Sequence, residues 1–241
     1  MKKIITIIFL LIISVFSYSE NFEEKTFEIN NNFFNAVTLP YENSEIINEN
    51  QYIFLYNLLG LEDKIEYRIF KMALKGYYKI SEKKNNYLTI IDFSKSSNEK
   101  RFLTIDMNMN KLVYYTYVAH GKNSGVEYAV SFSNKLNSYK SSLGFYLTGK
   151  TYNGRYGYSL KLFGLEEGYN SNAFKRGVVI HGATTSEPEY IKKSGFLGRT
   201  EGCPAVPKSL NKEIVNTIRG GSVVFIYGND DKYLRDSKYI K

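Results

Sequence analysis

The sequence predicts a mainly β fold with flanking helices, and three observations lead to this class. Short apolar runs of strand length follow one another from about residue 102 onward. Glycines stand between these runs or at their ends, where turns and bulges need them. Before them, Leu61 to Ile80 instead carries apolar residues at the spacing of an amphipathic helix. With 43% hydrophobic and 16% aromatic residues, the chain has enough material for a core.

The segment of residues 20–97 is polar and rich in Asn, with helical stretches. We expect it to pack on the main domain rather than to fold separately. Within it, Leu61 to Ile80 is the predicted helix, and the β-branched and aromatic run from Tyr87 to Phe93 predicts a strand.

Residues 98–230 are predicted to form the main domain. A hairpin is expected from the runs 102–106 and 111–118, and further strands are expected at 126–133, 144–148, 158–163, 178–181 and 222–227. A helix from Pro207 to Arg219 has Pro at its start and Gly220-Gly221 at its end, the usual asymmetry of helix termini. Residues 231–241 are predicted to be a short charged tail.

The first 19 residues have the pattern of a secretory signal peptide. Lys2 and Lys3 precede an apolar run from Ile4 to Phe16, and small residues lead to a predicted cleavage after Ser19. The apolar run is shorter than the roughly 20 residues of a membrane-spanning helix, and no later segment is long and apolar enough to span a bilayer. We therefore expect an exported protein of the periplasm, the cell wall or the extracellular space.

The formal net charge of +8 includes two units from Lys2 and Lys3, so the exported chain stays basic. Such a surface suits an anionic partner such as a cell wall. The basic residues form no stripe with interleaved aromatics, so no nucleic-acid partner is expected. A single Cys excludes an internal disulfide, and a lone thiol in an exported protein is either buried or used for chemistry.

That thiol, Cys203, follows Gly202, and the chain has two histidines, His120 and His181, each at the end of an apolar run and followed by Gly. A Cys becomes a nucleophile when a His takes its proton. Gly202 permits a turn that aims consecutive N–H groups at one point, as an oxyanion hole requires. On spacing alone, an inert buried Cys with two core histidines is an equally good interpretation. The chain has no CxxC or HExxH pattern, so neither a metal nor a cofactor is expected.

The order of these residues resembles the signature of the YkuD-type L,D-transpeptidase catalytic domain. That signature places a His-Gly, here His181-Gly182, before a loop that ends in Thr200-Glu201-Gly202-Cys203. Upstream, the segments 118–122 and 140–146 fall where the family has a Gly-Lys turn and a Gly-x-Phe segment. The chain is most similar to the murein L,D-transpeptidase catalytic domain family, whose Gly-Cys-Pro-Ala-Val-Pro run stands unaltered at residues 202–207. The resemblance spans roughly residues 102–227.

The resemblance implies a mixed β-sandwich or distorted barrel, and a monomeric enzyme that acts on peptidoglycan stem peptides. It makes Cys203 the nucleophile and His181 the base, with Gly202 in the oxyanion hole and the carbonyl of Gly182 orienting the imidazole. The implied reaction releases D-Ala from a tetrapeptide stem and forms a 3→3 cross-link. If water resolves the thioester, the same site is an L,D-carboxypeptidase. A non-catalytic wall-binding module is the alternative outside enzymology.

The chain departs from the family pattern in three places. The spacing from His181 to Cys203 is longer than usual, Glu201 stands where His is frequent, and Ala205 stands where Arg is common. Arg199 is the natural substitute as a cation that binds a carboxylate, although a solvated loop Arg is equally plausible. His120 either lines the site or fills a corner of the core, and we favour the site.

Two other cysteine enzymes fit less well. A sortase-like enzyme would need a Thr-Leu-x-Thr-Cys strand, and a papain-like enzyme has its Cys before its His.

Overall fold

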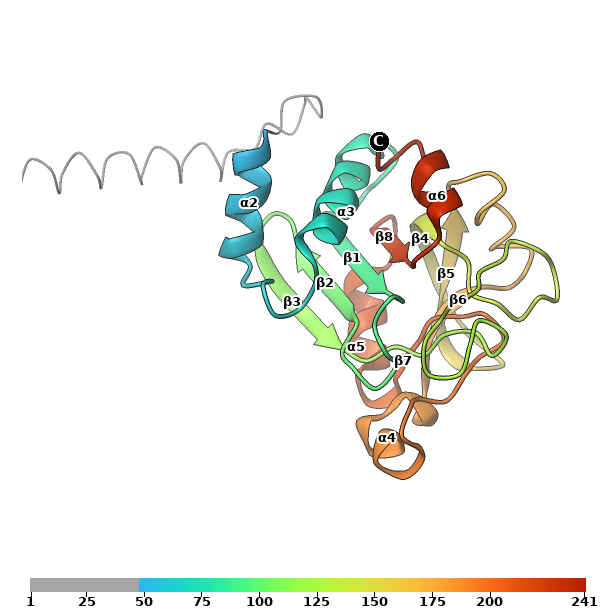
Figure 1. Cartoon of the computed structure of the whole chain (residues 1–241). Coiled ribbons are helices and arrows are strands. Elements are labelled where there is room, and N and C mark those ends of the chain that lie inside the picture. The colour runs from blue at the N-terminus through green and yellow to red at the C-terminus, as the bar shows by residue number, and fades with distance from the viewer. Residues whose placement is uncertain (1–47) are drawn as a thin grey trace, which may run out of the picture. The chain divides into compact units, whose positions relative to one another are not determined.

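The computed structural model of the protein describes residues 48–241 (Figure 1). The predicted signal peptide and residues 20–47 lie outside this range. The chain divides after Phe54 into two units, and the following description concerns the second, Leu55–Lys241. Within residues 48–241, no helix is both long and apolar enough to cross a membrane.

A single sheet of eight strands organises this unit. The strands are β1 (Tyr87–Asp92), β2 (Phe102–Asp106), β3 (Lys111–Thr116), β4 (Gly144–Gly154), β5 (Gly157–Gly164), β6 (Val179–Ala183), β7 (Ala205–Pro207) and β8 (Val223–Tyr227). Their order in the sheet is β3-β2-β1-β8-β4-β5-β6-β7, which can be followed in Figure 1. The pairs β1–β8 and β6–β7 are parallel, and the other pairs are antiparallel.

The two ends of the sheet approach each other. Ala119, which follows β3, exchanges two backbone hydrogen bonds with Ala205 of β7, at N–O distances of 2.8 and 3.3 Å. The edge strand β7 is therefore paired with β6 on one side and bridged to Ala119 on the other. This nearly closed sheet confirms the predicted distorted barrel, the expected fold class.

Helices flank the sheet. They are α3 (Tyr67–Lys79), α4 (Pro188–Ser194), α5 (Lys208–Ile218) and α6 (Asp231–Asp236), with a short 3-10 turn, η1 (Thr184–Ser186). A further helix, α2 (Glu49–Leu58), includes residues of both units. Helix α3 buries Ile69, Phe70 and Leu74 and contacts β1 and β8. It approaches the sheet so closely that a Cβ at Gly76 would collide with the ring of Phe145. Helix α5 buries Ile214 and Val215 and contacts β6.

Strands β1 and β8 lie in the middle of the sheet, and this position explains their sequences. All five residues of β8 and the last five of β1 are buried. A strand covered on both faces needs a nearly continuous apolar run instead of an alternating one. These runs were predicted as strands, and the structure confirms both.

One expected strand is wrong. Residues 126–133 form no ladder, and Val126, Tyr128 and Val130 point their side chains to solvent. The N–H groups of Val130 and Ser131 instead both donate to the carbonyl of Ser124, in a local turn. Alternating apolar residues resemble a strand in the sequence, but here they lie on the surface of an irregular loop.

The predicted helix from Leu61 begins later, at Tyr67. Lys64 and Ile65 donate to the carbonyl of Leu61 in a separate turn, and the hydroxyl of Tyr56 donates to the carbonyl of Ile65 at 2.6 Å. Leu61 and Ile65 are nevertheless buried, so the apolar pattern identified core residues beyond the helix itself.

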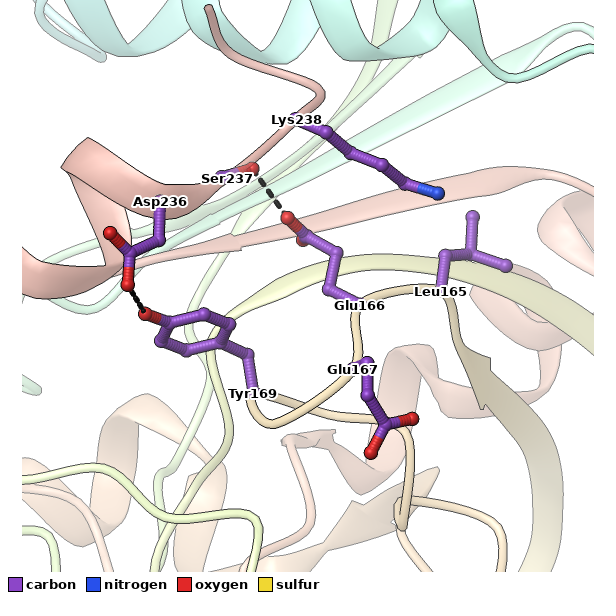
Figure 2. Close-up of a pocket in the computed structure, with 7 residues that line it drawn as sticks. All are labelled: Leu165, Glu166, Glu167, Tyr169, Asp236, Ser237 and Lys238. Carbon is purple, nitrogen blue, oxygen red and sulfur yellow. Dashed lines mark hydrogen bonds between the residues drawn. The ribbon is translucent and has the colours of Figure 1, made fainter.

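The expected division at residue 97 runs through the sheet, because β1 lies between β2 and β8. At the other end, the predicted charged tail at residues 231–241 includes helix α6 and is anchored by hydrogen bonds. Tyr233 donates to the buried carboxylate of Glu166. Ser237 also donates to this carboxylate, and Tyr169 donates to Asp236 at 2.7 Å (Figure 2). The small cavity beside these groups is thus part of the anchor of the C-terminal segment.

Candidate active site

Strand pairing brings the predicted base and nucleophile together. In the parallel pair β6–β7, His181 is opposite Ala205, and the N–H of His181 donates to the carbonyl of Pro204 at 3.4 Å. Cys203 lies immediately before Pro204, two residues before the position opposite His181. Two segments that are separated in the sequence by η1, α4 and a loop are held in one register by these bonds.

His181 presents an unused base nitrogen. Its Nδ1 lies 3.1 Å from the carbonyl oxygen of Gly182, and a carbonyl only accepts, so Nδ1 carries the proton. In the neutral ring, Nε2 then has a free lone pair. This atom is buried and has no hydrogen-bond partner among residues 48–241. Burial lowers the pKa of His181, and the bond to Gly182 opposes that shift. The imidazole is therefore neutral and ready to accept a proton.

Cys203 is a neutral thiol in the resting site. It is 5% exposed, and its Sγ donates to the carbonyl of Gly177 at 3.6 Å. Burial raises the pKa of Cys203 to about 11, while a backbone hydrogen bond from Val179 and the charge of Arg176 act in the opposite direction. A thiol with this pKa needs a base at the moment of attack, because very little thiolate exists at neutral pH.

The turn before Cys203 requires glycine. Gly202 has φ +118°, and a Cβ there would lie 2.8 Å from the carbonyl oxygen of Lys140. The hydroxyl of Thr200 closes the turn, since it accepts from the N–H of Gly202 at 3.1 Å and donates to the carbonyl of Cys203 at 2.7 Å. The predicted oxyanion donor at Gly202 is thus already engaged, whereas the N–H of Cys203 makes no hydrogen bond within residues 48–241.

Tyr156 covers His181, and no motif in the sequence points to this residue. It lies in the turn that joins β4 to β5, and its ring is stacked on the imidazole, with centroids 4.5 Å apart and planes at 17°. Its hydroxyl donates to Glu201 at 3.0 Å. Burial and the neighbouring carboxylate raise the pKa of Tyr156. Glu201 therefore has a visible role that the sequence did not assign: it anchors the tyrosine above the base.

A cavity of about 350 Å³ opens beside this stack. Its walls are formed by Lys122, Arg155, Tyr156, His181, Ala183, Thr185, Arg199, Thr200 and Glu201. Three cations face one carboxylate, so the cavity favours an anionic ligand. Arg199 lies here, where the sequence predicted a cation. Cys203 is not part of the walls, but it follows the lining residues Thr200 and Glu201 closely in the chain. Residues 48–241 contain no cluster of three or more His, Cys, Asp or Glu side chains that could hold a metal ion.

His120 lies in a core corner, contrary to the role in the site that we favoured from sequence. It is 1% exposed, and its Nδ1 is 2.8 Å from the guanidinium of Arg101. A guanidinium only donates, so Nδ1 accepts and Nε2–H donates to the carbonyl of Gly125 at 3.3 Å. Burial and the charge of Arg101 lower the pKa of His120 to about 4. Both ring nitrogens are occupied by the protein, which leaves none for a substrate.

Arg176 is a second residue that sequence reasoning missed. Its guanidinium donates to the carbonyls of Ser133 and Lys140 at 2.7 and 2.6 Å and also bonds the hydroxyls of Ser138 and Ser142. One of its nitrogens would lie 3.2 Å from a Cβ at Gly202. Arg176 thus holds the loop before β4 against the turn that carries Cys203. In the sequence, only the position of Arg176 shortly before the strand that carries His181 could have pointed to its role.

A family model described as an L,D-transpeptidase catalytic domain matches residues 61–227. No curated relative matches the chain.

Similar solved structures include an L,D-transpeptidase from Mycobacterium smegmatis, 10% identical, with 59% of each chain covered and a TM-score of 0.37. Another is an L,D-transpeptidase from Stackebrandtia nassauensis, 14% identical, with 74% of this chain and 77% of that chain covered and a TM-score of 0.38. A third is the helical cell shape determining protein Pgp2 from Campylobacter jejuni, 15% identical, with 68% and 55% covered and a TM-score of 0.42. The chain thus spans about three fifths of the length of the first of these proteins.

Proposed function

Because this chain belongs to the L,D-transpeptidase catalytic domain family, we propose that it is an exported, monomeric peptidoglycan L,D-transpeptidase with Cys203 as nucleophile and His181 as base. The single observation that carries the proposal is the lone pair of His181 Nε2. This nitrogen is buried and has no hydrogen-bond partner among residues 48–241. Strand β6, which carries His181, pairs with β7, which begins two residues after Cys203. A buried polar atom without a partner costs about 1–3 kcal/mol, and a proton acceptor in a reaction accounts for that cost.

The first step is attack with simultaneous proton transfer. Since thiol and imidazole are both neutral at rest, Cys203 Sγ–H leaves its bond to Gly177 and gives its proton to His181 Nε2 as sulfur attacks. The acyl donor is the amide between the third and fourth residues of a tetrapeptide stem. A C–S bond forms at that carbonyl carbon, and the carbonyl electrons move onto oxygen.

The oxyanion needs hydrogen-bond donors, and the N–H of Cys203 is the one that is free. The N–H of Gly202 joins it only if it leaves the hydroxyl of Thr200. The tetrahedral intermediate then expels the amine of D-Ala, which takes the proton held by His181. The carbonyl of Gly182 keeps the ring in the tautomer that this cycle requires.

The resulting thioester is resolved by a second nucleophile. An amine from a neighbouring stem gives His181 a proton, attacks the thioester carbon and releases Cys203 as a thiol, which leaves a 3→3 cross-link. If water attacks instead, the product is a tripeptide stem and the enzyme is an L,D-carboxypeptidase. The cavity beside His181 contains three cations that support binding of a substrate carboxylate: Lys122, Arg155 and Arg199. Of these, Arg199 takes the place of the Arg that is common in the family.

Incubation of the purified protein with disaccharide-tetrapeptide, followed by mass analysis, tests the proposal. A cross-linked dimer that has lost one D-Ala is expected, and a tripeptide without dimer identifies the carboxypeptidase. If no D-Ala is released while the protein still binds cell wall, the chain is a non-catalytic wall-binding module. Cys203→Ala protein is the matched control, since loss of the only Cys breaks no disulfide.

A further inference from the structure

A second and larger cavity, of about 500 Å³, lies on the β4–β5 hairpin away from the proposed site. Its walls come from β4, β5, the segment before β6, the turn after α5 and the turn after α3; the lining residues used below are Lys84, Lys150, Lys161, Phe163 and Phe174. None of these residues lines the cavity beside His181. Nothing in the mechanism above uses it.

An exposed aromatic shelf at this cavity consists of Tyr152, Phe163 and Phe174. These side chains are 38%, 42% and 53% exposed. Phe163 and Phe174 line the cavity, and Tyr152 lies outside the lining, next to Lys161. Phe163 and Phe174 are stacked, with centroids 5.2 Å apart and planes at 15°. Exposed large apolar side chains are common singly, but a contiguous set of them marks a binding surface.

The charges around the shelf are mainly positive. Lys161 extends over two of its rings, with Nζ 5.5 Å from the centroid of Tyr152 and 5.7 Å from that of Phe174. Lys84 and Lys150 add two more cations to the cavity, against the single carboxylate of Glu82. The surface therefore suits a ligand that combines flat apolar faces with negative charge.

The shelf lies on the same face of the sheet as His181. Residues directly opposite each other on neighbouring strands project to the same face, and Ser159 is opposite both Tyr152 and His181. Lys161 and Phe163 follow Ser159 at alternate positions of β5, so they share this face. From Ser159 to Phe163 the strand covers about 14 Å, at about 3.4 Å per residue.

A second connection runs through the segment before β6. Phe174 belongs to the shelf, Arg176 lies against the Gly202 turn, and the carbonyl of Gly177 accepts from Cys203 Sγ. The shelf and the nucleophile are thus joined by four consecutive residues as well as by one face of the sheet. A single extended ligand can reach both.

We propose that this cavity binds the glycan strand that carries the donor stem; this inference rests on the proposed function. The apolar faces of the sugar rings pack on the shelf, and carboxylates of the stem peptides that the strand carries pair with the lysines. The stem joins the sugar to the reacting amide through three residues, or about 10 Å of extended chain. That length falls within the span of the shelf, which runs from Tyr152, level with His181 across β5, to Phe163 about 14 Å further along the strand.

The test measures co-sedimentation with purified peptidoglycan sacculi, in a Cys203→Ala background that prevents turnover. Phe174→Ala and Lys161→Glu should each weaken binding about tenfold, the change expected when roughly 1.4 kcal/mol of contact is lost. Tyr128→Ala is the matched control, because Tyr128 is 50% exposed and lies in the irregular loop at 126–133. Thermal unfolding midpoints close to that of the parent verify that each variant is folded.

Sacculi stripped of their stems by an amidase decide what occupies the cavity. Such strands keep their sugars and carry free lactyl carboxylates, so binding that depends on Phe174 should persist. Binding that is lost with the stems overturns the proposal in favour of a peptide ligand. Equal binding by Phe174→Ala and Tyr128→Ala also overturns it, as does a dimer in gel filtration that Phe174→Ala dissociates, because a second copy then covers the shelf.

Failure of this inference is distinguishable from failure of the proposed function. A soluble tetrapeptide without sugar tests only the reaction at Cys203. If the protein with Cys203 intact releases no D-Ala from it, while Phe174 still governs binding to sacculi, the proposed reaction fails and the glycan site stands. If D-Ala is released but Phe174 and Lys161 have no effect on sacculi, the reaction stands and the glycan site fails.

Discussion

The ring of Tyr156 lies parallel to the imidazole of His181, with the two centroids 4.5 Å apart. The tyrosine is fixed in turn by its hydrogen bond to Glu201. Glu201 is one of the departures from the signature that the sequence otherwise resembles, and in the structure it anchors the stack. Together the two residues limit the motion of the imidazole and the access of water to it.

The stacking of Tyr156 on His181 should contribute more to activity than the hydrogen bond from Tyr156 to Glu201. Tyr156→Ala removes the ring above His181 and should lower kcat/KM for D-Ala release about tenfold, since one aromatic stack contributes about 0.5–1.5 kcal/mol. Tyr156→Phe keeps the ring and loses the bond to Glu201, so a smaller loss is expected. Steady-state kinetics on tetrapeptide compare the two variants. An equal loss in both would assign the effect to the hydrogen bond.

The two histidines should behave differently. His181→Ala removes the proposed base and should reduce turnover by about 10²–10⁴-fold with little change in stability. His120→Ala instead leaves the buried guanidinium of Arg101 with one partner fewer, which costs about 1–3 kcal/mol. Thermal unfolding should therefore shift down for His120→Ala, by roughly 2–4 °C per kcal/mol. A folded His120→Ala protein as inactive as His181→Ala would contradict this assignment.

Arg176 should favour the thiolate of Cys203. Its positive charge opposes the rise in the pKa of Cys203 caused by burial, so Arg176→Gln should raise that pKa further. Alkylation of Cys203 by iodoacetamide at pH 8 should then be slower, and the pH profile of its rate should move to higher pH. Arg176→Lys keeps a charge and should recover part of the rate. A purely structural role would leave the pH profile of a folded variant unmoved.

The acid limb of activity should reflect His181. Burial lowers its pKa from the ordinary 6.5, so the base remains neutral at pH values where a solvated histidine is already protonated. The profile of kcat/KM for tetrapeptide should therefore fall only below pH 6.5. A limb centred at or above pH 6.5 would be inconsistent with a buried neutral base.

A carbapenem should acylate Cys203, because its strained carbonyl resembles an acyl donor and oxyanion stabilisation assists the attack. Intact mass should rise by one drug equivalent, and the adduct should map to the peptide that contains Cys203. The Cys203→Ala variant should gain no mass. Absence of an adduct together with absence of D-Ala release would favour the wall-binding module.

The sequence predicted those parts of the fold that depend on burial. The runs that became β1 and β8 are apolar throughout because both faces of the central strands are covered. The strand predicted at residues 126–133 is wrong. An alternating apolar pattern does not distinguish a half-buried strand from a loop whose apolar side chains face solvent. The difference is decided by hydrogen bonds to Ser124, which have no signature in composition or spacing.

Only those residues of the candidate site that belong to local sequence motifs could be predicted. His181 and Cys203 are each flanked by glycines that mark special backbone, and their order in the chain carries the resemblance. Tyr156 and Arg176 contribute through contacts made by a hairpin turn and a connecting segment, which depend on the closed sheet. His120 shares the His-Gly pattern of His181, and its burial with Arg101 appears only when the chain is folded.

The bridge between Ala119 and Ala205 has a consequence for the behaviour of the protein in concentrated solution. An edge strand with unpaired backbone groups is a template for association with other chains. In this sheet, the N–H and the carbonyl of Ala205 are both hydrogen-bonded to Ala119. Strand β7 therefore has few free backbone groups that could pair with a strand of another chain. The segment that carries Cys203 is thereby protected from self-association into aggregates.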